Sequence, residues 1–514
     1  MGKVRQAVIM VGGQGTRLRP LTDTCPKPIL PVLDKPCLMY FIESIAKAGI
    51  TDVILACGYR SERIPSAIGD GSDLGIRISY SYESRPMGTG GAIKLLEDRL
   101  DDVFLAVNGD VFIDIDVQKE IDDHFAHGAS VTVSMTTVDN PTEYGIMGLD
   151  DRGYITRFKD KPKPEEVFSN YINSGVYVVD RDVLKFIPKD TQYDMSKELF
   201  PLLVEKGYRL CGHSIDGHWR DVGRPSDLFE ANLETAYRLN GSDTSGVKDS
   251  TVSGTSYFGK GTVAEGCEIN DSVVHAGCRI RNSFLDTSLV MSGSVVEGAD
   301  IYMSILGRGC IVGKGAKLRN AVLGDGTVVP ENAAVEGLAS RADFKRKCVF
   351  LDRDDTINDD IGHCSRPEDF KLLPGVSESL KMLNDIGFLT IMITNQSAIG
   401  RGMLDERGLE RIHEKMKNDL LATGGGVIDD IFYCPHLPDE GCECRKPKPM
   451  MGLKAIEKYN IDTAHSYMVG DSDRDMEFGR NIGVKSIKVT EGHDFNAAVR
   501  EILSRRLQFN IYKQ

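Results

Sequence analysis

The sequence lacks any apolar run that approaches the roughly 20 residues needed to span a bilayer. A short apolar stretch near its start, Ala7 to Val11, is too brief for the core of a secretory signal. Gln6 stands where a myristoylation signal requires Ser or Thr. We therefore expect a cytoplasmic protein with no membrane among its partners.

The sequence also lacks an excess of positive charge, since 62 lysines and arginines face 76 acidic residues and the net charge is -14. A protein that coats nucleic acid or an anionic membrane needs a broad basic surface. Nucleic acid is therefore not an expected partner. Any anionic substrate must be bound by cations that are gathered locally.

The cysteines form no disulfide framework, because the twelve of them are scattered, as in a reduced cytosolic protein. One cluster is the exception, and its four members lie within eleven residues: Cys434, His436, Cys442 and Cys444. Three thiolates and one imidazole make a tetrahedral ligand set that suits Zn²⁺. We expect a closed zinc site that braces a loop and takes no part in the chemistry.

At 514 residues the chain is too long for one hydrophobic core, and its length suggests about three domains. Residues 1–240 alternate short apolar strands, such as Val103 to Val107, with amphipathic helices. That alternation predicts an α/β domain with a mostly parallel sheet. A second such alternation occupies residues 347–510, after a charged linker at 337–347.

Between these segments, residues 247–336 lack helical periodicity, and β-branched residues recur every five or six positions beside glycines. So short a repeat predicts a parallel β-helix, which we expect to be left-handed, with about five coils of roughly eighteen residues. The same coil builds acyltransferases, which need a histidine base, but this segment has His275 alone. We expect a scaffold through which the chain forms a homo-oligomer.

A glycine-rich turn follows the first predicted strand and reads Gly12-Gly13-Gln14-Gly15-Thr16-Arg17-Leu18-Arg19-Pro20. Backbone N–H groups of such a turn can wrap a triphosphate, and Arg17 and Lys27 supply positive charge. The turn lacks the third glycine of a dinucleotide fingerprint, because Leu18 stands there, and it lacks the Gly-Lys-Ser/Thr of a P-loop.

The full string resembles the signature of the sugar-1-phosphate nucleotidylyltransferases, whose fold is Rossmann-like, over about residues 1–240. In that family two aspartates hold Mg²⁺ against the nucleotide phosphates, and Asp110 and Asp221 match them. The resemblance implies in-line attack of a sugar-phosphate oxygen on the α-phosphorus, with pyrophosphate leaving. Arg17 would stabilise the pyrophosphate, and Lys27 would bind the nucleotide or sugar phosphate.

Further matches to this family concern its two substrates. The segment Phe158-Lys159-Asp160-Lys161-Pro162 has Asp160 in place of the family's glutamate, which leaves the sugar open. Pro86-Met87-Gly88-Thr89-Gly90 is similar to a segment of guanylyltransferases and favours GTP. The resemblance implies sugar-phosphate contacts from Gly145, Asp160, Lys161 and Asn173. It implies nucleotide contacts from Gly12, Gly13, Gly15, Thr16, Arg17, Lys27, Pro86, Gly88 and Thr89.

Two carboxylates stand two residues apart after the later strand Val349 to Leu351, namely Asp352 and Asp354. One of such a pair can attack phosphorus while the other moves the proton of the leaving oxygen. A calcium loop is not indicated, because Ile357 and His363 occupy the positions that require Gly and Glu.

Three further segments follow in order, Ile393-Thr394-Asn395-Gln396-Ser397, Arg445-Lys446-Pro447 and Val469-Gly470-Asp471. With the paired aspartates they resemble the haloacid dehalogenase-type phosphatases, which have a second Rossmann-like α/β fold. The resemblance implies that Asp352 forms a phosphoaspartate and Asp354 is the acid/base. It also implies phosphoryl contacts from Thr394 and Lys446, and an Mg²⁺ site made by Asp352, Asp354 and Asp471.

The cysteine cluster and the segment from Asn395 to Gly402 closely resemble the heptose 1,7-bisphosphate phosphatases, with histidinol-phosphate phosphatases as nearest relatives. This resemblance implies that Asn395 and Arg445 bind the sugar phosphate. One position departs from the family, since Asp355 replaces its usual glycine. Pointing inward, Asp355 would repel the substrate or recruit metal; pointing outward, it would be harmless.

Three interpretations of the whole chain follow. In the first, a bifunctional enzyme removes the 7-phosphate of a heptose bisphosphate and then joins the 1-phosphate to GMP from GTP. In the second, the acceptor is mannose 1-phosphate and the phosphatase serves another ester, such as histidinol phosphate. In the third, the N-terminal half is a non-catalytic nucleotide or sugar sensor that regulates the phosphatase, which the retention of Arg17, Lys27, Asp110 and Asp221 argues against.

Overall fold

The computed structural model describes residues 3–13, 15–58, 63–83, 85–239, 241–338, 345–359, 362, 364–385 and 388–508. Contacts divide the chain into two compact units, Met1–Leu18 with Cys25–Ala231, and Arg19–Thr24 with Asn232–Gln514. Residues 339–344 of the predicted linker, and the end of the third predicted domain beyond 508, lie outside the described residues. In the described part, no helix is both long and apolar enough to cross a bilayer.

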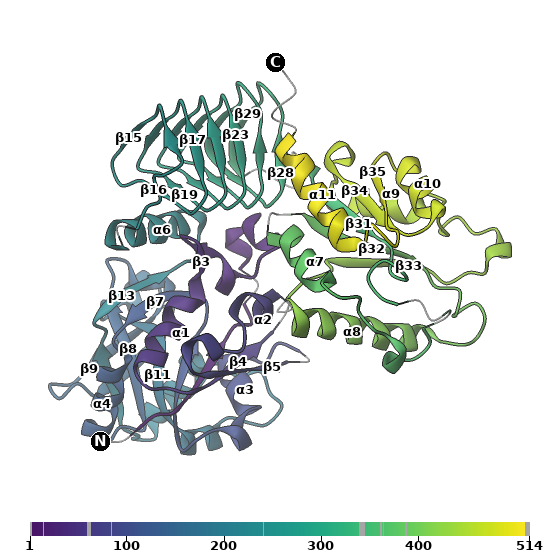
Figure 1. Ribbon diagram of the computed structural model, residues 1–514. Helices are drawn as coiled ribbons and strands as arrows, with labels where there is room; N and C mark the ends of the chain where they lie inside the picture. Colours follow the sequence, from purple (N-terminus) through teal and green to yellow (C-terminus); the bar gives the residue numbers. More distant parts are fainter. Residues whose placement is uncertain are drawn as a thin grey trace. The chain divides into compact units, whose positions relative to one another are not determined.

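The first unit contains a nine-stranded sheet in which four adjacent strands run parallel, in the order β6-β1-β4-β5 (Figure 1). All five residues of β1 are buried, as expected of a parallel strand that is covered on both faces. The predicted Rossmann-like core is confirmed. Its parallel strands are β1 (Gln6–Met10), β4 (Asp52–Cys57), β5 (Arg77–Tyr82) and β6 (Val103–Asn108).

The other half of this sheet differs from the mostly parallel arrangement that we expected. β11 is antiparallel to β6, β8 and β9, while β10 is antiparallel to β9 and β12 is parallel to β8. The turn between β9 and β10 is too short for a crossover, so these strands can pair only antiparallel. The strands are β8 (Val131–Thr137), β9 (Gly145–Leu149), β10 (Ile155–Asp160), β11 (Tyr171–Asp180) and β12 (Leu210–Ser214).

Two small ladders and six α-helices complete the first part of the chain. One ladder pairs β2 (Pro31–Val32) with β3 (Lys35–Pro36), and the other pairs β7 (Val111–Ile115) with β13 (Gly217–Asp221). The helices are α1 (Cys37–Lys47), α2 (Arg63–Ile68), α3 (Gly88–Lys94), α4 (Val117–His127), α5 (Phe200–Glu205) and α6 (Pro225–Leu239).

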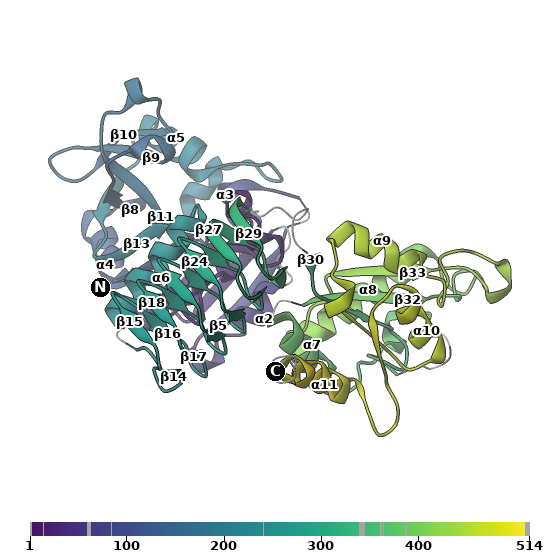
Figure 2. The same ribbon diagram turned by 90° about the horizontal axis from the view of Figure 1, so that it is seen from above.

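The middle segment is a parallel β-helix, as predicted, with short strands stacked in parallel rows (Figures 1 and 2). One row is β14 (Val247–Lys248), β17 (Val263–Glu265), β20 (Arg279–Arg281), β23 (Val295–Glu297), β26 (Ile311–Val312) and β28 (Thr327–Val329). A second is β15 (Thr251–Ser253), β18 (Glu268–Asn270), β21 (Phe284–Asp286), β24 (Asp300–Tyr302), β27 (Lys317–Leu323) and β29 (Ala334–Leu338). A third is β16 (Tyr257–Phe258), β19 (Val273–Val274), β22 (Leu289–Val290) and β25 (Ile305–Leu306), which pairs with the end of β27.

The coils are shorter than the eighteen residues that we expected. Val263 pairs with Arg279, and Lys317 pairs with Ala334, so successive coils are offset by 16 or 17 residues. Most strands contribute only two or three residues, and tight left-handed turns join them, for example at Gly266 with a φ of +65°. His275 is fully buried, with Nε2 2.9 Å from Asn232 Oδ1, which agrees with the structural role expected of it.

The C-terminal domain has a five-stranded, all-parallel sheet in the order β33-β32-β31-β34-β35. The order reverses beside β31, and open α/β sheets bind their ligands beyond the carboxyl ends of the strands at such a switch point. The predicted second Rossmann-like fold is confirmed. Its strands are β31 (Cys348–Leu351), β32 (Leu389–Asn395), β33 (Asp430–Cys434), β34 (Tyr467–Gly470) and β35 (Lys485–Lys488).

Helices cover both faces of this sheet (Figure 1). One buried cluster joins α7, α8 and α11 to side chains such as Val349 and Val469, and another joins α9 and α10 to Phe350 and Met468. Neighbours along β31 and along β34 therefore point to opposite faces, as in any strand. The helices are α7 (Val376–Asp385), α8 (Glu406–Thr423), α9 (Met450–Tyr459), α10 (Asp473–Asn481) and α11 (Phe495–Gln508).

Candidate active sites

The first candidate site gathers around Lys27, which begins a short 3-10 helix, Lys27–Ile29, and is only 7% exposed. Its ammonium lies 3.3 Å from Asp110 Oδ2 and 3.2 Å from Asp221 Oδ1. Three predicted site residues that are far apart in sequence are thus in direct contact. The two carboxylates offset part of the cost of burying the charge of the lysine.

The β7–β13 ladder brings the two aspartates together. Asp110 directly precedes β7, and Asp221 ends β13 opposite Val111. Gly109 permits the sharp turn before them, because a Cβ there would lie 2.6 Å from the Val11 side chain. Both carboxylates converge on one ammonium ion, and the Mg²⁺ site predicted at Asp110 and Asp221 stays a prediction.

Arg17 lies on the other side of Asp221 and is 55% exposed. A Cβ on Gly223 would lie 3.2 Å from Arg17 Nη2 and 3.3 Å from Asp221 Oδ2, so this glycine leaves room for both. Arg17 Nη1 is 3.3 Å from Glu143, whose other oxygen accepts a hydrogen bond from Arg224 at 2.8 Å. The sequence analysis missed Glu143 and Arg224, because only the fold brings them beside Arg17.

Of the predicted nucleotide-binding glycines, Gly12 lies in a close backbone approach and Gly15 has a positive φ. A Cβ on Gly58, which follows β4, would come within 2.7 Å of Gly12 Cα, and Gly15 has a φ of +57°. Gly13 faces open space, and Thr16 begins the short helix Thr16–Leu18 that carries Arg17. The contacts predicted from this turn to nucleotide phosphates stay a prediction.

The segment Pro86 to Thr89 leads into α3. A Cβ on Gly88 would lie 2.7 Å from the carbonyl oxygen of Tyr193, and Gly88 has a φ of +71°. Thr89 Oγ1 accepts a hydrogen bond of 2.9 Å from the backbone of Met195. The hydroxyl of Thr89 is thus engaged within the protein, and the contacts predicted from this segment to a nucleotide stay a prediction.

The predicted sugar-phosphate residues lie on neighbouring strands. Asp160 ends β10 opposite Gly145 in β9, and Lys161 N donates to Tyr144 O at 2.9 Å. Burial raises the pKa of Asp160, although the Lys161 charge opposes the rise. A Cβ on Gly145 would lie 3.6 Å from the Asn173 side chain. The fold therefore gathers these residues at one end of the β9–β11 region.

The second candidate site centres on Lys446, whose ammonium lies 2.8 Å from Asp352 Oδ1 and 2.6 Å from Asp475 Oδ1. Lys446 is 2% exposed, Asp475 is 0% exposed and Asp352 is 15% exposed. Burial disfavours the charge of Lys446, but the two carboxylates outweigh it and raise the pKa of the lysine. Asp475 was not predicted; it lies just beyond the Asp471 motif, where α10 turns it toward Lys446.

Asp352 follows β31 and has the place of the predicted nucleophile. Burial raises its pKa to about 7, with Lys446 opposing that rise and Asp475 adding to it. Thr394, at the end of β32, is 1% exposed and accepts a hydrogen bond of 2.9 Å from Gln396. Asn395 holds the backbone of Lys446 through bonds of 3.0 and 3.3 Å, so it positions the lysine.

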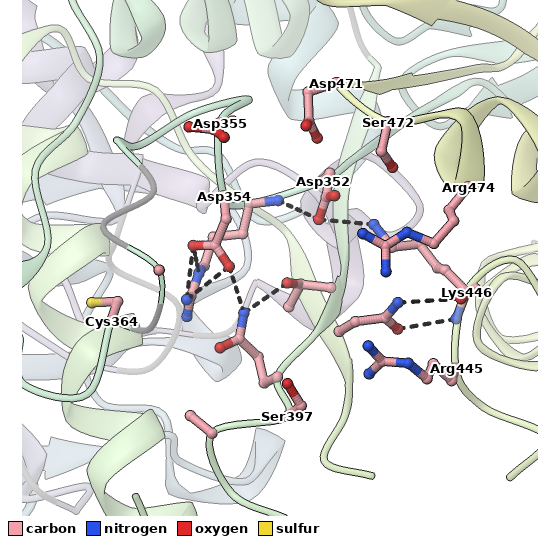
Figure 3. A pocket seen from close by; sticks show the side chains of 16 residues that line it. Asp352, Asp354, Asp355, Cys364, Ser397, Arg445, Lys446, Asp471, Ser472 and Arg474 are labelled. Carbon is pink, nitrogen blue, oxygen red and sulfur yellow. Dashed lines mark hydrogen bonds and ion pairs between the residues drawn. The ribbon is translucent and has the colours of Figure 1, made fainter. Parts of the chain in front are cut away.

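A cavity of about 250 Å³ opens over these residues. Figure 3 shows Asp354 and Asp355 on one side of Asp352 and the cations of Arg445, Lys446 and Arg474 on the other. An anionic group is favoured on the side with the cations. The cavity therefore suits an anionic ligand beside Asp352.

Asp352, Asp471 and Asp475 could together hold a cation, because one oxygen from each lies within 4.8 Å of the others. Such a set of carboxylates fits Mg²⁺. The side chain of Asp354 does not belong to this group and instead contacts Arg353 and Gln396. The place of Asp354 on the metal stays a prediction.

Asp355 has a φ of +54°, which explains why a glycine is usual at this position of the fold. The side chain is exposed at the rim of the cavity (Figure 3). The pKa of Asp471 is raised by burial, by Asp475 and, more weakly, by Asp355. Asp355 thus adds negative potential to the proposed metal site.

The four residues of the predicted zinc site lie together. The sulfur of Cys434 is 3.6 Å from Cys442 Sγ and from His436 Nδ1, and Cys444 Sγ is 3.2 Å from both Cys434 Sγ and His436 Nδ1. A tetrahedral ion with Zn–S bonds of about 2.3 Å requires sulfur atoms about 3.8 Å apart. The cluster could therefore hold zinc. It adjoins the segment of Arg445 and Lys446, since Arg445 Nη1 donates to His436 O at 3.1 Å.

Each of the three parts of the chain matches a known protein family. Residues 6–238 match the nucleotidyl transferase family, residues 254–352 match the GlmU-like C-terminal hexapeptide family, and residues 443–507 match the HAD-hydrolase-like family. The HAD hydrolases use Mg²⁺, which agrees with the carboxylates around Asp352.

Individual relatives cover the N-terminal part. A mannose-1-phosphate guanylyltransferase of Mycobacterium tuberculosis is 33% identical over 332 residues, which are 64% of this chain and 82% of the relative. The probable mannose-1-phosphate guanylyltransferase 2 of Oryza sativa subsp. japonica is 33% identical over 65% of this chain and 94% of its own. A mannose-1-phosphate guanyltransferase of Candida albicans is 39% identical over 44% of this chain and 62% of its own.

The chain belongs to the sugar-1-phosphate nucleotidyltransferases. It is guanylyltransferase-like, and the same polypeptide carries a hexapeptide β-helix and a HAD-family hydrolase domain.

Proposed function

We propose that this chain is a bifunctional enzyme of nucleotide-sugar biosynthesis. Its C-terminal site removes the 7-phosphate of heptose 1,7-bisphosphate, and its N-terminal site joins the remaining heptose 1-phosphate to GMP from GTP. The observation that carries the proposal is the buried Asp352–Lys446–Asp475 arrangement, which one chain combines with a Cys3His cluster and with the Lys27–Asp110–Asp221 arrangement.

At the C-terminal site, an oxygen of Asp352 attacks phosphorus while the bond from phosphorus to the sugar oxygen breaks. Asp354 gives its proton to that leaving oxygen. Water then attacks the phosphoaspartate and loses a proton to Asp354, and the bond to Asp352 breaks to release phosphate. Lys446 and Thr394 hold the phosphoryl oxygens, and bound Mg²⁺ would neutralise their charge.

At the N-terminal site, an oxygen of the sugar 1-phosphate attacks the α-phosphorus of the nucleotide while the bond to pyrophosphate breaks. The glycine turn binds the phosphates through backbone N–H groups, Arg17 stabilises the leaving pyrophosphate, and Lys27 holds a phosphate oxygen. Mg²⁺ on Asp110 and Asp221 would neutralise the charge that gathers on the phosphates. Gly145, Asp160, Lys161 and Asn173 orient the sugar phosphate.

The names of the relatives support GTP as the nucleotide, since several act as mannose-1-phosphate guanylyltransferases. They also support a second candidate, in which mannose 1-phosphate is the acceptor and the phosphatase serves another ester. Asp160 is one methylene shorter than the glutamate expected there, so its reach toward a hydroxyl group is the feature on which the two candidates differ. A purely sensory N-terminal half would not need Lys27 between two carboxylates.

The test supplies GTP, ATP, UTP and dTTP in turn with heptose 1-phosphate or mannose 1-phosphate and follows pyrophosphate. Phosphate release from heptose 1,7-bisphosphate and from histidinol phosphate is followed separately. We expect the highest kcat/KM for GTP with heptose 1-phosphate, and for heptose 1,7-bisphosphate. A preference for mannose 1-phosphate would establish the second candidate, and no pyrophosphate from any pair would contradict the transferase assignment.

We also propose that the β-helix is the surface through which the chain forms a homo-oligomer. Its stacked rows present short, regular strands, and a solenoid of this kind contributes a broad side surface. Light scattering of the full chain after size-exclusion chromatography tests this, and a monomeric mass at micromolar concentration would contradict it.

A further inference from the structure

Arg353 stands between the two aspartates of the phosphatase site, and its side chain is 1% exposed. Two nitrogens of its guanidinium contact the carboxylate of Asp354, with Nε 2.9 Å and Nη2 2.8 Å from Oδ1, and Nη2 3.1 Å from Oδ2. Contacts from two guanidinium nitrogens to both carboxylate oxygens restrict the orientation of the carboxylate as well as its place. The contact is therefore more specific than a simple attraction between charges.

Two amide side chains complete the hold on Asp354. Asn358 Nδ2 lies 3.2 Å from Oδ1, and Gln396 Nε2 lies 3.0 Å from Oδ2 and 2.9 Å from Thr394 Oγ1. Gln396 thus connects the proposed acid/base to the residue that is expected to hold the phosphoryl group. Asp354 is engaged on both oxygens by donors from three different positions of the chain.

The guanidinium of Arg353 makes few other polar contacts among the described residues. Its third nitrogen, Nη1, is buried with no hydrogen-bond partner among the described residues. His413 of α8 lies close by, and burial together with the Arg353 and Lys417 charges lowers its pKa to about 4, so it stays neutral. Burying a guanidinium is costly unless it is well paired. The pairing with Asp354 offsets the cost of burying Arg353.

We propose that Arg353 is a positioning residue, which fixes the carboxyl group of Asp354 for proton transfer to the leaving oxygen of the phosphate ester. The inference rests on the proposed function, in which Asp352 is the nucleophile and Asp354 the acid/base. The backbone N–H of Arg353 donates to Asp352 Oδ1 at 2.7 Å, whereas its guanidinium is bonded to Asp354. The positioning role belongs to the side chain, which acts through Asp354.

The leaving oxygen offers a way to isolate this role. An alkyl oxygen leaves as an alcohol and needs the proton of Asp354 as its bond to phosphorus breaks. A p-nitrophenyl oxygen leaves as a stable phenolate and needs no proton. A misplaced Asp354 should therefore slow the first turnover of an alkyl ester and spare that of p-nitrophenyl phosphate. General loss of structure would slow both.

The experiment measures two first-turnover rates. One is the release of p-nitrophenolate from p-nitrophenyl phosphate, and the other is the release of the alcohol from heptose 1,7-bisphosphate. Histidinol phosphate serves as a second alkyl ester. For Arg353→Met, we expect the alkyl rate to fall about 100-fold, as for a misplaced catalytic group. The p-nitrophenyl rate should fall less than about threefold, because no acid is needed. Arg353→Lys keeps the charge but loses the paired bonds, so its alkyl rate should be intermediate.

Two comparisons make the outcome decisive. Adding Arg353→Met to Asp354→Asn should change the alkyl rate by less than about twofold, because the two residues act as one unit. Arg346→Met is the matched control, since Arg346 is also a buried arginine of this unit, at 5% exposure, and does not line the cavity. It should leave the ratio of the two rates unchanged.

Equal losses for both esters in Arg353→Met would overturn the inference, as would additive effects with Asp354→Asn. The proposed function fails in a different way. If Asp352→Asn still hydrolyses p-nitrophenyl phosphate, the nucleophile is wrong, whatever Arg353 does. If the wild type hydrolyses histidinol phosphate but not the heptose ester, the proposed substrate is wrong, and the Arg353 comparison is read on histidinol phosphate.

Discussion

The transferase site and the phosphatase site each place a buried lysine between two carboxylates, but the two sites differ in depth. Lys27 stands 3.3 and 3.2 Å from Asp110 and Asp221, whose side chains are 50% and 21% exposed. Lys446 stands 2.8 and 2.6 Å from Asp352 and Asp475, which are 15% and 0% exposed. The group of one lysine and two carboxylates is therefore partly open to solvent in the transferase site and almost closed to it in the phosphatase site.

This difference follows from the chemistry that we propose for each site. The transferase forms no bond to the protein, so its carboxylates need only meet a nucleotide and a cation that arrive from solvent. The phosphatase uses Asp352 as a nucleophile, which must be shielded and aimed. Burial raises the pKa of Asp352 to about 7, and Lys446 opposes that rise, so the same contact that closes the site also favours the reactive carboxylate.

The largest difference is expected when each lysine is replaced by methionine. Lys446→Met leaves Asp475 buried without its cation, and breaking a buried pair in this way costs about 3–5 kcal/mol. Phosphate release should fall about 10³-fold, through loss of a charged phosphoryl contact. Lys27→Met should lower the free energy of unfolding by only about 1 kcal/mol, because its partners are partly in water.

Hydrogen exchange measures the two changes in stability in their own domains, over β31–β35 for Lys446→Met and over β1–β6 for Lys27→Met. Similar protection losses in the two domains would remove the distinction between an open and a closed site.

Removal of zinc should have the next largest effect, and it should affect the phosphatase site but not the transferase site. Arg445 contacts His436, and Cys444 precedes Arg445 and Lys446, so loss of the ion should loosen the loop that presents Lys446. A zinc-selective chelator in excess Mg²⁺ should reduce phosphate release about 10-fold or more. Pyrophosphate release should not change. Metal analysis before and after treatment should show the loss of one zinc ion per chain, and undiminished phosphate release after that loss would refute the bracing role.

A buried carboxyl group without such a cation provides a contrast with Asp475. Glu120 of α4 is 1% exposed, and burial raises its pKa to about 8, with Ser134 opposing the rise and Asp116 and Asp123 adding to it. Between about pH 4.5 and 8 the folded chain keeps a proton that the unfolded chain loses. Stability should therefore fall as the pH rises through that range, by on the order of 3 kcal/mol.

Glu120→Gln should abolish this part of the pH dependence. At pH 8 the transferase domain of the variant should be more stable than that of the wild type. The single tryptophan, Trp219, lies in β13, so its fluorescence reports unfolding of this domain without interference from the phosphatase domain. Urea titrations at pH 5 and pH 8 provide the comparison. Identical slopes against pH in wild type and variant would show that Glu120 does not hold its proton.

The smallest effect is expected for Asp355→Gly. Asp355 has a φ of +54°, and relief of that backbone conformation should stabilise the domain by about 1 kcal/mol. Removing a carboxylate from the rim of the cavity should also lower KM for a phosphate ester a few-fold, with kcat little changed. Asp355→Asn, which removes the charge but keeps the side chain, is the matched control. It should lower KM without adding stability.

Much of both sites could be predicted from the sequence, because their residues directly follow strands and have short motifs around them. Asp352, Thr394 and Asp471 each follow or end a parallel strand of one sheet, so the fold alone brings them together. Asp475 was missed because its role depends on α10 turning it toward Lys446. Arg353 was missed because sequence does not show which way the residue between two aspartates points.

The fold itself was predictable in outline, with two errors of detail that have local causes. The β-helix period was overestimated because glycines and β-branched residues mark its corners only approximately, whereas strand pairing fixes the offset at 16 or 17 residues. The antiparallel half of the first sheet was missed because the alternation of strands and helices does not show the direction in which strands such as β9 and β10 run. Only the short turn between them distinguishes the two arrangements.

The central claim is that one chain carries two separate phosphate sites, and it is tested most directly by following both products at once. Heptose 1,7-bisphosphate and GTP are supplied to Asp110→Ala, to Asp352→Asn and to an equal mixture of the two variants, with phosphorus NMR as the readout. We predict phosphate and heptose 1-phosphate from Asp110→Ala, no phosphate from Asp352→Asn, and GDP-heptose from the mixture. GDP-heptose from Asp110→Ala alone, or phosphate from Asp352→Asn alone, would contradict the account.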